Sequence, residues 1–264
     1  MSKIQQNLEF YTKKLRFKGY AKSTIDCYSY FLRLFLEYAN KPLSHITKKD
    51  AYDFIDSCSD AEHGQKTQVI SSLKLFYRFV VESELDKIKT ERPRKKKRLP
   101  RVIESSVLEQ KLSQIKNLKH KAILELGYRC GLRVSEVCNL NVTDIESDKM
   151  LILVRDSKFN KDRYCPMSKT LLRILREYYK VYRPNEFLFN GQHGRYSVSS
   201  CQKIFKKYID ENKSFHTCRH SGLTQMLNNG TNLRTIQSIA GHSSSKTTEI
   251  YTHVSNKLLQ AAAL

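Results

Sequence analysis

A run of basic residues containing two prolines divides the chain into two parts. Residues 89–101 read KTERPRKKKRLPR, with eight basic residues against a single acid. Pro93 and Pro100 disfavour a helix here, because the proline ring fixes its own φ and restricts the residue before it. A chain of 264 residues is long for one compact domain and sufficient for two. We therefore predict a helical domain over residues 1–88, a basic linker over 89–103, and a second domain over 104–264 that ends in a short tail.

The charge of the chain predicts a polyanionic partner. The formal net charge is +21, and an excess of this size most simply indicates binding to nucleic acid. The linker cluster Lys95, Lys96, Lys97 and Arg98 is the candidate for contacts with phosphates along a duplex, held between two folded domains. An unbound tether that repels itself and a localisation signal are the alternative interpretations of such a run.

The cysteines and the apolar residues predict the compartment. Seven cysteines are scattered along the chain without a C-x-x-C pair, which is typical of reduced thiols and not of a disulfide framework or a zinc site. The sequence opens with no signal peptide and contains no apolar run long enough to span a membrane. We expect a cytoplasmic protein with no membrane partner and no bound metal.

The first ninety residues predict four amphipathic helices. The apolar positions recur at helical spacing in residues 4–15, 25–38, 52–55 and 69–80. Gly19 ends the first stripe and Pro42 follows the second. Thr47 with Asp50 three residues later has the pattern of a capping box that opens the third helix. Four such helices with short connections form a small bundle.

The second half predicts a mixed domain. Residues 150–154 and 163–167 are rich in β-branched or apolar residues and predict two strands, with a hairpin tip at 156–162 between them. Ser105 or Ser106 is expected to cap a helix that runs to about residue 115. Further helices are expected at 119–128, 168–181 and about 199–211.

Residues 216–251 predict three short helices and carry most of the candidate chemistry. The first begins near His216 and ends at Asn229-Gly230; the second begins at Asn232, a good N-cap residue, and ends at Gly241. The third opens after the serines at 243–245 and is expected to carry Tyr251.

Four side chains in this stretch suit chemistry on a phosphate. His216 and Arg219 are three residues apart and share a helical face, and His242 follows a helix end. A guanidinium and imidazoles bind and neutralise a phosphate, and the oxygen of Tyr251 can attack it. His220 and His253 are the alternative histidines, which we expect to have supporting roles.

An arginine further upstream belongs to the same candidate set. Arg133 stands at the start of a predicted helix, where free backbone N–H groups already favour an anion. Glu136, three residues later, is placed to orient Arg133 or a neighbouring imidazole. Gly131-Leu132-Arg133-Val134-Ser135-Glu136, closed by Leu140, is the full segment.

These segments resemble the tyrosine recombinase (phage integrase) family. The resemblance rests on H-x-x-R-H, then G-H, then a tyrosine nine residues later, together with the upstream G-L-R-x-S-E segment. The family completes its set with a hairpin lysine in a K-G-N-K-x-R pattern, where this sequence has Phe159 in place of the glycine. That substitution leaves Lys158 and Lys161 as alternatives, and we favour Lys158. Cys218 replaces the common leucine and is interpreted as a packing residue.

The resemblance implies a fold and a reaction. The fold is mainly α with two domains: an N-terminal four-helix core-binding bundle (SAM-like) and a C-terminal mixed α/β catalytic domain with a small antiparallel sheet. The reaction is site-specific DNA recombination through a 3′-phosphotyrosyl intermediate formed by Tyr251, without cofactor or metal. Arg133 and Arg219 would bind the phosphate oxygens and His242 would add a donor. His216 would accept the tyrosine's proton or bind the phosphate, and Lys158 would protonate the leaving 5′ oxygen.

The implied partners are a double-stranded recombination site and further copies of this chain, as a tetramer in synapsis. The apolar tail is expected either to fold back on its own domain or to dock on a neighbouring protomer, and we favour docking. A type IB topoisomerase-like enzyme and a non-catalytic DNA-binding regulator are the alternative functions. Chromosome-dimer resolution, integration or excision of a mobile element, and inversion use the same catalytic residues, and we favour a Xer-like or simple integrase role among them.

Overall fold

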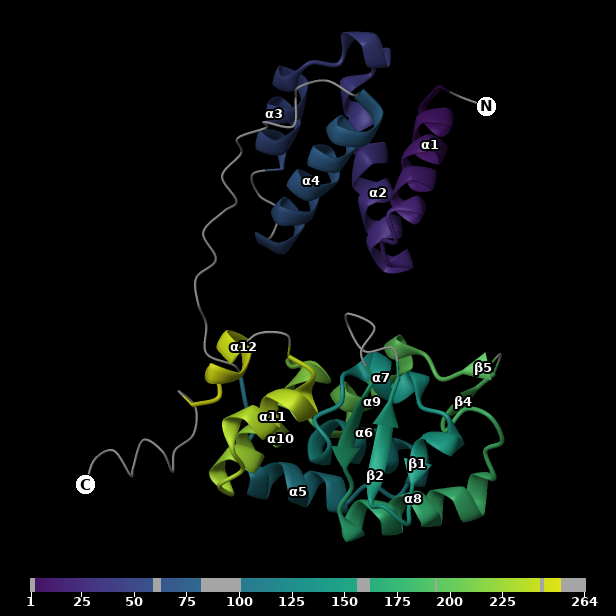
Figure 1. Cartoon of the computed structure of the whole chain (residues 1–264), viewed down its shortest axis with the longest axis vertical. Coiled ribbons are helices and arrows are strands. Elements are labelled where there is room, and N and C mark those ends of the chain that lie inside the picture. Colours follow the sequence, from purple (N-terminus) through teal and green to yellow (C-terminus); the bar gives the residue numbers. More distant parts are fainter. Residues whose placement is uncertain are drawn as a thin grey trace, which may run out of the picture. The chain divides into compact units, whose positions relative to one another are not determined.

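The structure is a computed structural model, and it divides into two compact units, Met1–Lys97 and Arg98–Leu264 (Figure 1). We describe each unit by itself, as the N-terminal and the C-terminal unit. Most of the predicted linker, including Lys95–Arg98, lies outside the described residues, as do both candidate hairpin lysines and the C-terminal tail. The described residues are 3–58, 63–81, 101–155, 162–192, 194–242 and 245–252.

The N-terminal unit is the predicted four-helix bundle. Its apolar stripes meet in one core that includes Tyr11, Leu32, Phe35, Leu73 and Phe76. Two short turns accompany the helices, a 3-10 turn at Leu43–His45 and a π-helical turn at Tyr77–Val81. The helices are α1 (Lys3–Phe17), α2 (Lys22–Ala39), α3 (Lys48–Ser57) and α4 (His63–Phe76).

The start of α3 confirms the predicted capping box. Asp50 Oδ2 accepts from the Thr47 backbone at 2.8 Å, and Thr47 Oγ1 accepts from the Asp50 backbone at 3.4 Å. The helix buries Phe54, whose ring lies 5.5 Å from that of Phe35. Tyr52 and Ile55 are half-buried and pack against the same core. The apolar positions of α3 therefore lie at the core of the bundle, as their spacing predicts.

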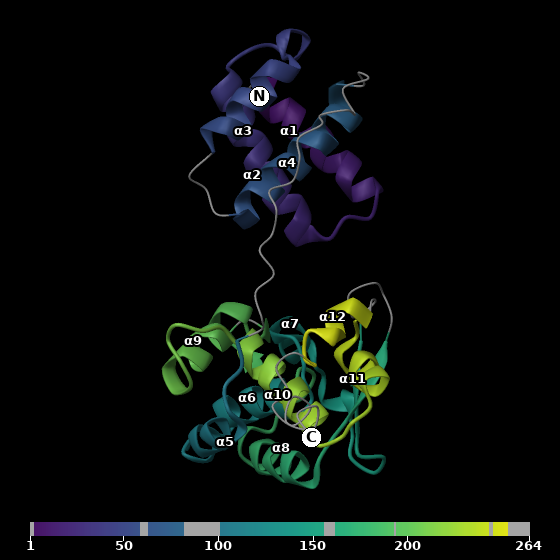
Figure 2. The ribbon, with the colours of Figure 1, turned by 90° about the vertical axis from the view of Figure 1, so that its left-hand side faces the viewer.

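The C-terminal unit is built around one central helix. Helix α6 (Leu118–Arg129) contacts five others, α5, α7, α8, α9 and α10 (Figures 1 and 2). Residues 122–128 of α6 are all buried, as expected of a helix that is surrounded on every side. Its partners are α5 (Ser105–Ser113), α7 (Val134–Asn139), α8 (Lys169–Tyr182), α9 (Val198–Tyr208) and α10 (His216–Asn228).

A small antiparallel sheet lies against these helices. The strand order is β1–β2–β3. Val154 pairs with Arg163 as the last pair of β2 and β3 before the predicted hairpin tip. The tip itself lies outside the described residues. A second pair of strands, β4 and β5, was not predicted. The strands are β1 (Ile145–Glu146), β2 (Leu151–Val154), β3 (Arg163–Pro166), β4 (Asn190–Gly191) and β5 (Gly194–Arg195).

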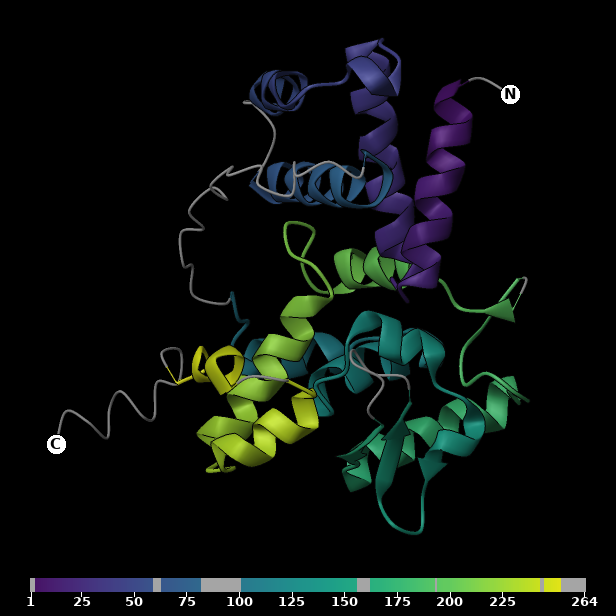
Figure 3. The same ribbon diagram turned by 45° about the horizontal axis from the view of Figure 1, so that its top comes forward.

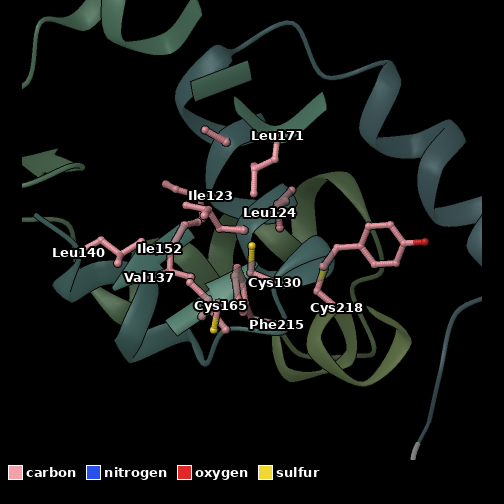
Figure 4. Packing of buried hydrophobic residues seen from close by; sticks show 14 of the residues in the cluster. Ile123, Leu124, Cys130, Val137, Leu140, Ile152, Cys165, Leu171, Phe215 and Cys218 are labelled. Carbon is pink, nitrogen blue, oxygen red and sulfur yellow. The ribbon is translucent and has the colours of Figure 1, made fainter. Parts of the chain in front are cut away.

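Apolar side chains from the central helix, the sheet and α8 form one core. Figure 4 shows Ile123 and Leu124 of α6 together with Ile152 of β2 and Leu171 of α8. Cys218 is completely buried in this core, as its interpretation as a packing residue requires. All seven cysteines are free thiols. Among the residues that the structure describes, no helix combines the length and the apolar character needed to cross a membrane.

Helix α10 crosses α6 at very close range. A Cβ atom added to Gly222 would lie 1.8 Å from the backbone oxygen of Tyr128, so only glycine fits at this crossing. The residues on α10 that precede Gly222, which include His216 and Arg219, are thereby fixed against the central helix of the unit.

Two local predictions are wrong. Helix α5 begins at Ser105 with Glu104 as its N-cap, so neither serine caps it. Helix α12 (Ser245–Glu249) ends before Tyr251, which lies in the following turn with its N–H donating to Thr248 O at 3.0 Å. The helix therefore ends two residues before Tyr251, which the following turn carries.

Candidate active site

The C-terminal unit brings together five of the six predicted site residues. His216 and Arg219 lie on α10, and His242 follows α11 (Leu233–Ala240). Arg133 precedes α7 and Tyr251 follows α12. Helices α10, α11 and α12 lie side by side at one end of the unit (Figures 1 and 3). The sixth residue, Lys158, is outside the described residues.

The carbonyl end of α11 is the anchor of the site. Its last three carbonyls each accept a hydrogen bond from a different arginine. Arg163 Nε donates to Ile239 O at 2.7 Å. Arg219 Nη2 donates to Ala240 O, and Arg133 Nη2 donates to Gly241 O at 3.1 Å. A helix C-terminus carries unpaired carbonyls and a partial negative charge, so it stabilises all three guanidiniums.

Gly241 gives α11 an end that fixes His242. Its φ of 60° is left-handed, and the N–H of His242 donates back to Gln237 O at 3.1 Å, which closes a Schellman-type end. A Cβ at this position would also lie 3.1 Å from the guanidinium of Arg163. Glycine is therefore required both by the turn and by the neighbouring arginine.

Glu136 is the counter-charge of the arginines. Its carboxylate accepts from Arg133 Nη1 at 2.7 Å, from both terminal nitrogens of Arg163 at 3.0 and 2.8 Å, and lies 3.8 Å from Arg219 Nη1. Burial alone would raise the pKa of Glu136, but the hydrogen bonds and charge of Arg163, followed by the backbone and charge of Arg133, lower it to about 2. The carboxylate is ionised at neutral pH, and the expected contact with Arg133 is present.

Arg163 was missed as a site residue. It opens β3, its side chain is almost fully buried, and it joins the sheet to both Glu136 and the end of α11. The sequence did carry a signal for it, because the K-G-N-K-x-R pattern ends in an arginine at this position.

Arg219 is buried and charged. Its Nη1 donates to Gly131 O at 2.6 Å, while its Nε has no hydrogen-bond partner among the described residues. Burial, followed by the like charge of Arg133, lowers the pKa of Arg219 to about 10, which leaves it protonated at neutral pH. A buried guanidinium N–H without an acceptor favours binding of an anionic oxygen.

His242 is held between Arg219 and Thr248. Nε2 lies 3.0 Å from Arg219 Nη2 and Nδ1 lies 3.0 Å from Thr248 Oγ1. Since arginine can only donate, we assign Nε2 as the acceptor and Nδ1 as the protonated nitrogen. Burial and the charge of Arg219 lower the pKa of His242 to about 4, so the ring is neutral at neutral pH. Thr248 was not foreseen, because nothing in the sequence pairs it with His242.

Tyr251 is completely buried beside these groups. Burial raises the pKa of Tyr251 to about 12, against the lowering effect of Arg219 and Arg133. Its hydroxyl lies 2.9 Å from Nδ1 of His220, a residue expected to have only a supporting role. The His220 ring in turn meets His216 edge to face, with centroids 4.3 Å apart. His216 itself is exposed to solvent at the first position of α10. His253 lies outside the described residues.

The arrangement suits an anion and a nucleophile. Three guanidiniums against one carboxylate leave a net positive charge beside a phenol. Within the described part of the chain, no group of three or more histidine, cysteine or acidic side chains could hold a metal ion.

Comparison with protein families decides the relationship. A model of the phage integrase family matches residues 101–257, more than half of the chain. The chain belongs to this family. A model of the phage integrase N-terminal SAM-like domain matches residues 8–87. The mainly helical two-part fold expected from the sequence is therefore confirmed.

Curated relatives span almost the whole chain. The tyrosine recombinase XerA of Pyrococcus horikoshii is 35% identical over 97% of this chain and 91% of its own length. A tyrosine recombinase of Thermosipho africanus is 28% identical over 97% of both chains. The tyrosine recombinase XerD of Staphylococcus epidermidis RP62A is 31% identical over 92% of both.

Solved structures share the fold. XerH recombinase bound to a palindromic difH substrate, in a post-cleavage complex, has a TM-score of 0.71 at 20% identity and covers 90% of this chain and 78% of its own. A lambda integrase dimer bound to a core site also has a TM-score of 0.71, at 16% identity, and covers 92% and 96%. At these identities the likeness concerns the fold alone.

The environment of Glu136 predicts a specific acid sensitivity. Its pKa is lower in the folded than in the unfolded chain, from 4.5 to about 2. Its stabilising contribution is therefore complete above pH 4.5 and is lost as the pH falls towards 2. Between pH 6 and pH 3, the wild type should lose about 2 kcal/mol more unfolding free energy than Glu136→Gln. Urea unfolding at a series of pH values measures the difference.

Glu211→Gln, at an exposed position of the same unit, is the matched control for that experiment. A difference between wild type and Glu136→Gln that stays constant from pH 6 to pH 3 would show that the carboxylate is not held by the arginines.

Proposed function

We propose that this chain is a site-specific DNA recombinase in which Tyr251 attacks a DNA phosphodiester and forms a 3′-phosphotyrosyl intermediate. The observation that carries the proposal is the buried phenol of Tyr251 beside Arg219, whose Nε–H has no acceptor among the described residues. Membership of the phage integrase family and relatives named tyrosine recombinases support the same reaction.

The phosphate would bind beside Arg219 and Arg133. Arg219, through its Nε–H that has no acceptor among the described residues, and Arg133 would bind its non-bridging oxygens through charge-assisted bonds. His242 now accepts from Arg219 through Nε2. A bound phosphate raises the pKa of this imidazole from about 4, because its negative charge offsets that of Arg219. His242 then gains a proton on Nε2 and becomes a donor.

The chemical step requires two proton transfers and no cofactor. The bond from Tyr251 Oη to phosphorus forms while the bond from phosphorus to the 5′ oxygen breaks. The phenol's proton leaves as Oη attacks, with His216 as its acceptor or as a further phosphate ligand. Lys158 protonates the departing 5′ oxygen, with Lys161 as the alternative. Attack by a 5′ hydroxyl on the phosphotyrosine reverses the step and rejoins the strand.

The domains would act together as a clamp on duplex DNA. Residues 1–88 form the core-binding domain, residues 89–103 the linker, and residues 104–264 the catalytic domain with its tail. Lys95, Lys96, Lys97 and Arg98 lie along phosphates, and four copies of the chain assemble in synapsis, with the tail docked on a neighbour. DNA-bound relatives of the same fold support DNA as the partner. The cytoplasmic location stays a prediction.

A type IB topoisomerase-like activity would use the same phosphotyrosyl chemistry without exchanging partners, and a regulator would bind without cutting. The curated relatives that span the whole chain are named recombinases, which favours exchange. Relaxation of supercoiled plasmids of any sequence, without recombination at a defined site, would favour the topoisomerase.

Tyr251→Phe should abolish the covalent protein–DNA adduct and leave DNA binding unchanged, because only the attacking oxygen is removed. The wild-type protein is incubated with nicked duplexes from the DNA that flanks its gene, and covalent joints are mapped; the variant is then tested on the mapped duplex. An adduct formed by Tyr251→Phe would assign the nucleophile to another residue.

Lys158→Ala should slow cleavage by about 10²- to 10⁴-fold, the range typical of a missing general acid. Sulfur in place of the bridging 5′ oxygen should restore the rate, because a thiolate leaves without a proton. Arg133→Ala should not recover, since its charge acts on the non-bridging oxygens. Rescue of Lys161→Ala instead would move the assignment by three residues, and rescue of neither variant would exclude both lysines.

Replacing Lys95, Lys96, Lys97 and Arg98 together with alanine should weaken binding to specific and random duplexes alike. Each phosphate contact contributes about −0.9 to the slope of log K against log salt, so the slope should flatten by up to about 3.6. Fluorescence anisotropy titrations at several salt concentrations measure it. An unchanged slope would identify the linker as an unbound tether.

A further inference from the structure

The hydroxyl of Tyr251 is tied to the helix that carries Arg219. Its Oη lies 2.9 Å from Nδ1 of His220, the residue directly after Arg219 on α10. The tyrosine side chain has no exposed surface, so water does not replace this contact. Tyr251 itself lies in a turn beyond α12. The bond therefore connects a nucleophile on a turn to a helix that is packed against the centre of the unit.

The direction of this hydrogen bond follows from the charges around it. Tyr251 is a neutral phenol at neutral pH, since burial raises its pKa. Burial, followed by the charges of His216, Arg219 and His242, lowers the pKa of His220 to about 3. A neutral imidazole has one donor nitrogen and one acceptor nitrogen, whereas the guanidinium of Arg219 can only donate. Of these two neighbours, only the imidazole can accept the phenol's hydrogen bond. We therefore assign the phenol as donor, Nδ1 of His220 as acceptor, and the ring proton to Nε2.

The position of His220 on α10 explains why its ring can hold the phenol. Its ring meets that of His216, one turn earlier on the helix, edge to face at 4.3 Å between centroids. The ring of His242 lies parallel to that of Tyr251, with centroids 6.3 Å apart. The aromatic neighbours limit how far the phenol can tilt, and the hydrogen bond limits how far its oxygen can move.

We propose that His220 is a positioning residue for the nucleophile, whose Nδ1 accepts the hydrogen bond of Tyr251 and holds its oxygen beside Arg219 for attack. The inference rests on the proposed role of Tyr251. A buried imidazole that is so weakly basic beside Arg219 does not remove the phenol's proton in this arrangement, so His220 orients the hydroxyl. Proton acceptance remains with the partner proposed above. What the reaction requires at this position is an acceptor atom, not a titrating base.

Three variants at position 220 test whether the reaction needs a hydrogen-bond acceptor there, an aromatic ring or a titrating base. His220→Asn keeps an oxygen near the position of Nδ1, His220→Gln moves the oxygen towards the position of Nε2, and His220→Phe keeps a ring without an acceptor. Single-turnover adduct formation is measured at saturating protein on the nicked duplex mapped with the wild type. His220→Phe and His220→Gln should be slower by about 10- to 100-fold. His220→Asn should stay within about threefold of wild type, with DNA affinity unchanged in all three.

The result that overturns the proposal is a His220→Phe variant as fast as wild type, or a His220→Asn variant as slow as His220→Phe. Thermal unfolding followed by circular dichroism shows whether each variant is folded. If the wild type forms no adduct on any flanking duplex, it is the proposed function that fails.

Nuclear magnetic resonance tests the inference without DNA. In the wild type, long-range ¹H–¹⁵N spectra should show His220 with its proton on Nε2 and a hydrogen-bonded Nδ1. Tyr251→Phe should shift the Nδ1 resonance of His220 and leave its tautomer intact. A proton on Nδ1, or a resonance that Tyr251→Phe does not move, overturns the proposal.

Discussion

The carboxylate of Glu136 lies among three guanidiniums, and the arrangement of the site depends on it. Arg133, Arg163 and Arg219 repel one another, and burying them without a counter-ion would be strongly unfavourable. One carboxylate contacts all three, and the negative end of α11 supplies one acceptor to each. The cluster keeps a positive excess even so. This positive excess favours the binding of an anion at the site.

The side chains beside the arginine cluster are uncharged at neutral pH, and the positive charge of the cluster contributes to this. His220 and His242 remain unprotonated at neutral pH because burial and the arginines act against a further positive charge. Tyr251 keeps its proton because it is buried. The site thus holds a protonated phenol among neutral imidazoles. Under the proposed function, a bound phosphate would change this balance, since its negative charge favours protonation of nearby imidazoles. The substrate itself would therefore help to set the protonation state in which it reacts.

The sequence predicts the parts of this molecule whose signals are local. Apolar periodicity gives the helices, the Thr47–Asp50 pair gives the start of α3, and Asn232 with Gly241 gives both ends of α11. The resemblance to a family supplied the residues that cluster at the site. Thr248 and the contact of His220 with Tyr251 were missed, because they depend on elements that meet only in the folded chain. Arg163 was missed although the K-G-N-K-x-R pattern ends at its position. The strands β4 and β5, with two residues each, are too short to leave a periodic pattern.

The carbonyl end of α11 has a consequence for how the chain can vary in length. Ile239, Ala240 and Gly241 offer successive oxygens to three different arginines. Successive carbonyls of an α-helix point about 100° apart around the axis. Inserting or removing one residue within Leu233–Ala240 would rotate this end and pair every guanidinium with the wrong oxygen. The contacts at this end therefore fix the rotation of all eight residues of α11, so a change in length is compatible with the site only outside this helix.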